Sequence, residues 1–165
     1  MIDRTKINYA EHASPLGTLL LAATERGLCG IYFEEHRHFK GAEGWRRDDG
    51  HALLAQCAVQ LDAYFAGRRC DFDLLIDPQG TPFQQGVWQA LRAIPYGSTS
   101  TYGAHARALG NPGALRAVGA AIGRNPLSIV IPCHRVLGAS GALTGFAGGL
   151  ERKRALLALE APGLA

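Results

Sequence analysis

The chain has 165 residues, of which 47% are hydrophobic and 19% charged, a composition able to bury a core in one domain or in two small ones. Its formal net charge is only +3, which gives little indication of a nucleic-acid partner. The charged start, MIDRTKINYAEH, has no signal-peptide core, and no apolar run approaches the roughly 18 residues of a membrane span. We therefore expect a cytoplasmic protein without a membrane segment.

The first part of the sequence predicts an antiparallel sheet. Residues 6–24 alternate in polarity and then become apolar, with SPLG as a turn between two strands. Residues 27–35, GLCGIYFEE, predict a third strand. The polar, glycine-broken residues 36–50 predict a surface loop.

A helix is predicted next, over residues 51–65. Its apolar side chains recur at helical spacing until Gly67, and they are Leu54, Cys57, Leu61, Tyr64 and Phe65. Residues 70–77, CDFDLLID, predict a further short strand, and PQG follows as a linker. This half of the sequence shows no pattern that points to chemistry.

Histidines and cysteines in this half give no metal or disulfide pattern. The histidines, His12, His36, His38 and His51, lie in loop-like or exposed settings. His36 and His38 could be read as zinc ligands, but no matching pair exists, so a solvated loop is the better interpretation. Cys29, Cys57 and Cys70 have no redox or zinc spacing, and we interpret them as structural or incidental.

Strong helix signals open the second half. Thr81, Pro82 and Gln84 are arranged as a helix cap, a first-turn proline and a capping box. Along the helix that follows, one apolar face is predicted from Phe83, Val87, Leu91 and Ile94.

Two short helices joined by a glycine-containing turn come next. The first is predicted over residues 102–109 and ends at Gly110, and the second begins with Asn111 as its cap and continues to about Ile122. This pattern is typical of a helix-turn-helix. The second helix, GALRAVGAAIG, carries few large side chains. It could pack closely on another helix, or it could present a low surface to a groove in DNA with Arg116 as a probe.

Cys133 lies at the end of an apolar run, SIVIP, and next to His134. We predict a buried strand over residues 128–131, ending at Pro132. Adjacent Cys and His do not have the spacing of metal ligands, and a disulfide has no partner pattern, so Cys133 is either a core residue or a nucleophile. Glu160, at the end of the last helix, is a candidate to orient His134, or it is only an exposed acid. The glycine-rich residues 138–149 are either a flexible connector or a wall around a flat ligand.

Residues from about Phe83 to Glu160 resemble the O6-alkylguanine-DNA alkyltransferases. The resemblance is carried by PCHRV, RAVG and NP at the distances usual in that family. It implies an α/β N-terminal domain, with an antiparallel sheet plus a helix and a ribonuclease-H-like fold, over residues 1–79. A mainly helical C-terminal domain with the helix-turn-helix and the active site would cover residues 80–165.

The resemblance also implies catalytic roles for five residues. Cys133 corresponds to the nucleophile that takes an alkyl group from O6 of guanine, and a polarisable thiolate suits attack on a saturated carbon. His134 would act as general base through a bridging water, with Glu160 orienting it. Tyr102 would donate toward N3 of guanine, and Asn125 would tie the helix-turn-helix to the active-site segment. No cofactor is implied.

The implied partner is double-stranded DNA that contains O6-alkylguanine, with the damaged nucleotide flipped out of the stack. Arg116 matches the arginine that fills the resulting gap, and its helix would lie in the minor groove with little sequence specificity. The expected DNA-binding residues are Arg116, Thr101, Gly103, Asn111, Ala114, Leu115, Ala117, Gly119, Ala120 and Arg135. The expected pocket residues are Tyr102, Pro132, Val136, Phe146, Ala147 and Gly148.

Some positions depart from the family pattern. Phe146 stands where many members have tyrosine, Ala147 where some have serine, and the bulkier Leu115 where alanine is common. The metal site of some members' N-terminal domain has no clear counterpart, so we expect no zinc. We expect a monomer that acts once, because an S-alkylcysteine is too stable to release its alkyl group.

Three alternatives stay open at this point. The first is an alkyltransferase-like protein that binds damaged guanine without repairing it, although that class lacks the cysteine found at position 133. The second is a helix-turn-helix transcription regulator, although no ligand or dimerisation domain is recognisable. The third is a Cys-His-Glu hydrolase, which would turn over repeatedly.

Overall fold

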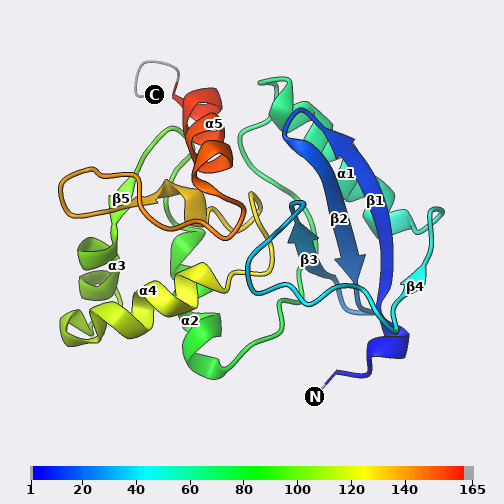
Figure 1. Ribbon diagram of the computed structural model, residues 1–165, viewed down its shortest axis with the longest axis horizontal. Helices are drawn as coiled ribbons and strands as arrows, with labels where there is room; N and C mark the ends of the chain where they lie inside the picture. The colour runs from blue at the N-terminus through cyan, green and yellow to red at the C-terminus, as the bar shows by residue number, and fades with distance from the viewer. Residues whose placement is uncertain (1, 162–165) are drawn as a thin grey trace.

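The computed structural model describes residues 2–161, and its N-terminal half is built on a four-stranded sheet (Figure 1). The strands are β1 (Asn8–Ser14), β2 (Gly17–Ala23), β3 (Leu28–Tyr32) and β4 (Arg46–Arg47), in the order β3-β2-β1-β4. β1, β2 and β3 are antiparallel neighbours, as expected, and the predicted SPLG turn joins β1 to β2. β4 is parallel to β1 and makes the sheet mixed, a feature that the polar composition of its segment did not indicate.

Helix α1 (Ala52–Phe65) packs against β1 and β2, which confirms the predicted helix. It buries Leu54, Cys57, Leu61 and Tyr64, so four of the five predicted apolar positions face the core. Its first turn is capped by the side chain of His51, which accepts a hydrogen bond from the backbone N–H of Leu54. This side of the sheet is therefore covered by one amphipathic helix.

The C-terminal half is mainly helical (Figure 1). Its helices are α2 (Pro82–Leu91), α3 (Tyr102–Ala108), α4 (Leu115–Gly123) and α5 (Leu150–Glu160), and a small parallel pair is formed by β5 (Ser100–Thr101) and β6 (Val136–Leu137). Short 3-10 turns lie at Arg4–Lys6, Pro112–Ala114 and Cys133–Arg135. No helix in the described part of the chain is long and apolar enough to cross a membrane.

Two helix-start predictions have different outcomes. The capping box of α2 is present, because the Thr81 side chain accepts from the Gln84 N–H while the Gln84 side chain accepts from the Thr81 N–H. Asn111, by contrast, makes no side-chain cap, because the 3-10 turn Pro112–Ala114 separates it from α4. Phe83 is 43% exposed and does not share the buried face of α2.

Two predicted strands are absent from the described structure, namely residues 70–77 and residues 128–131. Each of these regions contributes only an isolated bridge to the outer edge of β3, through Ile76 opposite Leu28 and Leu127 opposite Ile31. Residues 128–131 are buried as their apolar composition indicated, although in a turn rather than in a ladder, whereas residues 70–77 are only partly buried and Leu75 is 73% exposed. The segment that precedes Cys133 is thus docked on the sheet of the N-terminal half.

The two halves share one hydrophobic core. A single cluster of buried side chains includes Leu21 and Leu61 from the first half together with Val118, Ile129 and Leu156 from the second. The segment that leads to Cys133 is therefore held by packed side chains from both halves.

Candidate active site

Cys133 lies at the start of a 3-10 turn, directly after a tight, buried loop. Ile129 has a φ of +73°, which is rare for a β-branched residue, and this value turns the chain back on itself. Local backbone bonds satisfy the loop, from the Val130 N–H to the Ser128 carbonyl at 2.8 Å and from the Cys133 N–H to the Ile131 carbonyl at 2.8 Å. The compact loop leaves Cys133 only 8% exposed.

Asn125 braces this loop from inside. Its Nδ2 donates to the Ile131 carbonyl at 2.7 Å, and its Oδ1 accepts from the Leu127 N–H at 3.0 Å. Burial raises the pKa of the Cys133 thiol, and a hydrogen bond from Asn125 and the charge of Lys153 partly offset that increase. Cys133 is therefore a thiol at rest and needs a base to become a nucleophile.

A cavity of about 310 Å³ opens above Cys133. Of the six expected pocket residues, Tyr102, Phe146 and Ala147 line it. The other lining residues belong to α4 and its C-terminal end, to the glycine-rich loop and to the loop after β3. They are Gly119, Ala120, Ile122, Gly123 and Arg124, then Gly145, and then Arg37 and His38. The loop contributed by the N-terminal half was not anticipated from the sequence.

The other three expected pocket residues are placed elsewhere. Pro132 lines a separate small cavity beside Tyr96, and Val136 is completely buried in β6. Gly148 lies against the rings of Phe33 and Phe146, where an added Cβ would come within 2.6 Å and 2.8 Å of ring atoms. These residues support the pocket wall from behind and do not form its surface.

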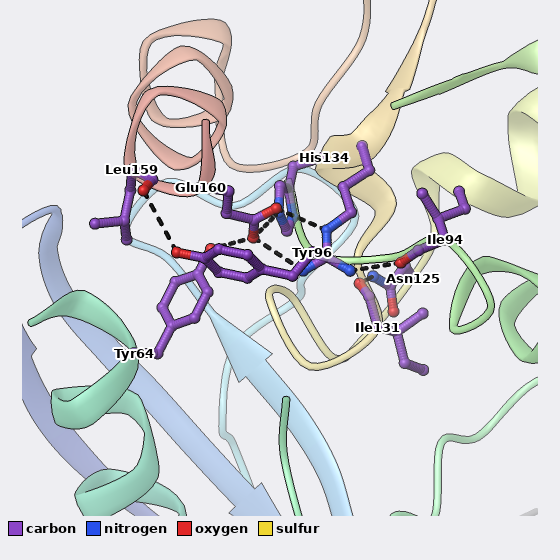
Figure 2. Close-up of polar contacts among 9 residues, drawn as sticks. Tyr64, Ile94, Tyr96, Asn125, Ile131, His134, Leu159 and Glu160 are labelled. Atoms are coloured by element: carbon purple, nitrogen blue, oxygen red, sulfur yellow. Dashed lines mark hydrogen bonds and ion pairs between the residues drawn. The ribbon is translucent and has the colours of Figure 1, made fainter. Parts of the chain in front are cut away.

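His134 and Glu160 form a buried pair (Figure 2). The imidazole Nε2 lies 2.7 Å from Glu160 Oε2, and both side chains are at most 1% exposed. A carboxylate partner makes Nε2 the protonated nitrogen, which leaves Nδ1 as a free acceptor, and Nδ1 has no partner among residues 2–161. Burial lowers the pKa of His134, although Glu160 opposes that shift, so the ring is held as a neutral base.

Arg135 has a different place from the one expected. Its Nε donates to Glu160 Oε1 at 2.7 Å, its Nη2 to Glu160 Oε2 at 3.1 Å, and its Nη1 to the Ile94 carbonyl at 2.7 Å. The side chain is buried, so it is not available to contact DNA as predicted. The buried Glu160 carboxylate needs a positive partner, and Arg135 supplies that charge inside the protein instead of extending into solvent.

Glu160 is consequently a strongly stabilised anion. Burial alone would raise the pKa of its carboxyl, but hydrogen bonds from His134 and Arg135 outweigh burial and lower the pKa to about 2. The side chain is therefore not the exposed acid that its position at a helix end also allowed.

Two residues of the site escaped prediction. Tyr64, on α1, donates its hydroxyl to Glu160 Oε2 at 2.5 Å. Lys153, on α5, is completely buried and donates to the carbonyls of Val136 at 2.6 Å, Thr144 at 2.7 Å and Gly145 at 3.2 Å. The helical spacing marked Tyr64 as core, and nothing in the sequence indicated that the long side chain of Lys153 is turned inward.

Most of the expected DNA-binding residues surround α4. Arg116 and Ala117 are exposed, Leu115 is 48% exposed, and Ala120 is exposed beside the cavity. Asn111 is exposed before the helix, whereas Ala114, Gly119 and Gly103 are half-buried. The Thr101 hydroxyl is already used to cap α3, where it accepts from the Ala104 N–H at 3.0 Å. The exposed face of α4 has few long side chains besides Arg116.

His36 corrects the prediction of a solvated loop. It is only 8% exposed and stacks on Phe33, and its Nδ1 accepts a hydrogen bond from the Phe33 N–H at 3.4 Å. Burial lowers the pKa of His36 to about 4, so it is neutral near physiological pH. Within residues 2–161, no group of three or more His, Cys, Asp and Glu side chains is placed to hold a metal ion.

Comparison with family models matches both halves of the chain. Residues 7–78 match the ribonuclease-like domain of 6-O-methylguanine DNA methyltransferase, and residues 82–162 match its DNA-binding domain. The methylated-DNA–protein-cysteine methyltransferase of Mycobacterium bovis is 49% identical over 93% of this chain and 92% of its own length. The protein of the same name from Methanosarcina acetivorans is 47% identical over 92% of this chain and 97% of its own.

Solved structures give the same result. The O6-methylguanine methyltransferase of Mycobacterium tuberculosis superposes with a TM-score of 0.87 at 47% identity, covering 94% of this chain and 93% of that one. A structure of that organism's OGT in complex with DNA superposes with a TM-score of 0.86 at 48% identity, covering 94% and 93%. With both halves matched at this identity, the chain belongs to the 6-O-methylguanine DNA methyltransferase family.

Proposed function

We propose that Cys133 is the acceptor through which this protein repairs DNA, by taking the alkyl group from O6 of guanine once and irreversibly. The protein is a methylated-DNA–protein-cysteine methyltransferase by its relatives, and DNA is its partner. The observation that carries the assignment is a cysteine thiol at a 310 Å³ cavity, next to a buried histidine that is hydrogen-bonded to a carboxylate. A thiol in such a setting is activated by its base only when a substrate is in place.

The transfer balances in atoms and charge. His134 takes the proton of Cys133, through a bridging water, onto its free Nδ1. A bond forms between the sulfur and the alkyl carbon as the bond from that carbon to guanine O6 breaks, and the electron pair remains on the base. The guanine anion then takes up one proton and the imidazolium of His134 gives one up, both exchanged with water, so that the thiol proton is in effect passed to the leaving guanine. The thioether product is stable, so the protein acts once.

Pocket residues are suited to a flat, polar base. Phe146 offers an aromatic wall, and Ala147 can offer its backbone N–H to O6. The Tyr102 hydroxyl lies 3.2 Å from the Thr144 carbonyl, at the mouth of the same cavity, and would donate instead to N3 of the leaving guanine. Such a donor stabilises the negative charge that develops on the base.

Duplex DNA would be bound through α4. O6 of a stacked guanine is inaccessible to a protein side chain, so the nucleotide must rotate out of the helix. The low-relief face of α4 would enter the minor groove with little sequence specificity, and the exposed Arg116 would occupy the gap in the stack. We propose a monomer, divided into a domain of residues 1–79 and a DNA-binding domain of residues 80–165, in line with the ranges of the two family models.

Mass spectrometry after mixing with DNA containing O6-methylguanine tests this function. We expect one equivalent of protein to gain one methyl group on the peptide that carries Cys133, and Cys133→Ala to gain none. The buried but unreactive Cys57 on α1 serves as the internal control. Repeated turnover would indicate a hydrolase instead. Tight binding of the modified duplex by folded protein without any gain of mass would indicate a damage-binding protein.

A further inference from the structure

Tyr64 connects the N-terminal half of the molecule to the candidate active site. Its ring is completely buried on α1, 96 positions before Glu160, and its hydroxyl donates to Glu160 Oε2 at 2.5 Å. The same oxygen accepts from His134 Nε2 at 2.7 Å (Figure 2). No residue of the N-terminal half was expected to reach this pair.

We propose that Tyr64 is a positioning residue for alkyl transfer: its hydroxyl holds Glu160 Oε2 and thereby keeps His134 oriented and uncharged, ready to take the proton of Cys133. This inference rests on the proposed roles of Cys133, His134 and Glu160. It adds a residue from the ribonuclease-like half to the proton path.

Charge balance around Glu160 explains why a neutral donor is needed. Arg135 binds the carboxylate through two nitrogens, so the ion pair is already neutral overall. Oε2 nevertheless has remaining acceptor capacity, which His134 and Tyr64 share. The Tyr64 hydroxyl is a third donor on Oε2, beside Arg135 Nη2 and His134 Nε2. It draws electron density away from the bond to His134, and this weakens the pull of the carboxylate on an imidazolium.

The groups that face this cluster come from several elements. α5 contributes Glu160 and Lys153, the 3-10 turn contributes Cys133 and Arg135, α1 contributes Tyr64, and the loop after α2 contributes Tyr96. Burial raises the pKa of Tyr64, and the charge of Glu160 raises it further, so the hydroxyl remains a donor across the working range of pH. Tyr64 can therefore act on His134 without titrating itself.

Replacing Tyr64 by phenylalanine keeps the ring and removes only the O–H. Oε2 then becomes a stronger acceptor for His134, the imidazolium is stabilised, and the pKa of His134 rises. Since the neutral imidazole is the base, the acid limb of the rate profile should move to higher pH, by about one unit for the loss of one hydrogen bond to a charged group. A tyrosine that only fills space would change stability without moving this limb.

Tyr96→Phe is a matched control for Tyr64→Phe. The two rings are edge to face with centroids 6.2 Å apart, but the Tyr96 hydroxyl lies 3.4 Å from a backbone carbonyl, that of Leu159, and not from Glu160. Removing the hydroxyl of Tyr96 should therefore leave the pH dependence of the transfer rate unchanged. Site-specific 3-fluorotyrosine at position 64, a more acidic phenol and a stronger donor, should move the limb to lower pH.

The experiment measures single-turnover transfer from O6-methylguanine DNA as a function of pH for these proteins, together with the NMR titration of the His134 ring nitrogens. An upward shift for Tyr64→Phe, a downward shift with fluorotyrosine and no shift for Tyr96→Phe support the proposal. Identical profiles and titrations for all of them overturn it. If the unaltered protein transfers nothing to Cys133, the proposed function fails, and the His134 titration still decides the role of Tyr64. The fluorotyrosine protein keeps that decision possible if Tyr64→Phe does not fold.

Discussion

The Glu160 cluster and the exposed face of α4 show two opposite ways to build a site. The cluster gathers three ionisable side chains, Glu160, His134 and Arg135, where water is excluded. The face of α4 exposes Ala117 and Ala120 and offers Arg116 as its long side chain. In the proposed function, alkyl transfer would depend on buried, closely paired groups, whereas DNA binding would depend on the absence of bulky side chains on α4. Substitutions should therefore damage the first region through stability and rate, and the second through binding alone.

Glu160→Gln should break the first region most severely. The amide cannot neutralise the buried Arg135, and removing one partner of a buried ion pair costs about 3–5 kcal/mol in the free energy of unfolding. Transfer to Cys133 should slow by at least about a hundredfold, because the base loses its orienting carboxylate. Urea unfolding and single-turnover kinetics measure the two effects.

Glu151→Gln provides the comparison, because Glu151 lies on the same helix but is exposed. Its unfolding free energy and transfer rate should stay close to those of the unaltered protein. A normal rate in Glu160→Gln would remove the carboxylate from the mechanism.

Lys153→Met tests whether a second buried charge supports the pocket wall. The variant keeps the aliphatic stem but removes the amine that donates to the carbonyls of Val136, Thr144 and Gly145, of which Thr144 keeps a donor in the Tyr102 hydroxyl. Unsatisfied buried acceptors should lower the free energy of unfolding by about 2–3 kcal/mol. Hydrogen exchange should increase in residues 141–149, which this amine ties to α5.

The exposed Arg154→Met on the same helix should change neither the stability nor the exchange rates. Unaltered exchange in Lys153→Met would mean that the glycine-rich wall is held by its other contacts.

Ala117→Leu should have the smallest effect, and only on binding. A leucine on the exposed face of α4 should leave unfolding unchanged within about 0.5 kcal/mol. It should weaken binding to a methylated duplex by about tenfold, or ~1.4 kcal/mol, since the backbone can no longer approach the groove. Fluorescence anisotropy measures the affinity, and transfer from the free modified base should remain normal.

Ala55→Leu, exposed on α1, is the control for Ala117→Leu and should bind DNA normally. Equal affinities for the two variants would place the DNA surface elsewhere on the molecule.

Features that depend on interactions between neighbouring residues were predicted correctly from the sequence. The capping box at Thr81 and the helical spacing that ends in α1 each need only a few neighbouring residues, and both are present in the structure. The buried run before Cys133 was correctly predicted to be inside, but not its shape. The same residues can be buried in a strand or in a tight turn. The turn forms here because Ile129 has a positive φ, which the conformational preference of isoleucine does not predict.

Long-range pairing explains the remaining differences. Arg135 was expected to contact DNA, yet Glu160, 25 positions later, binds it inside the protein. Tyr64 was predicted as a core residue, and it is one. Its hydroxyl acquires a partner only when α1 and α5 meet. The two residues of each pair are far apart in the sequence, so a pattern read from a short stretch of sequence cannot reveal that they interact.

The bridge between Ile31 and Leu127 has a consequence for biosynthesis. The outer edge of β3 pairs with residues 75–77 and 126–128, so half of that edge stays open until the later segment has left the ribosome. An unpaired edge strand is a template for aggregation. The residues that close this edge lie directly before the loop that carries Cys133, so covering the edge and placing that loop on the sheet require the same contacts.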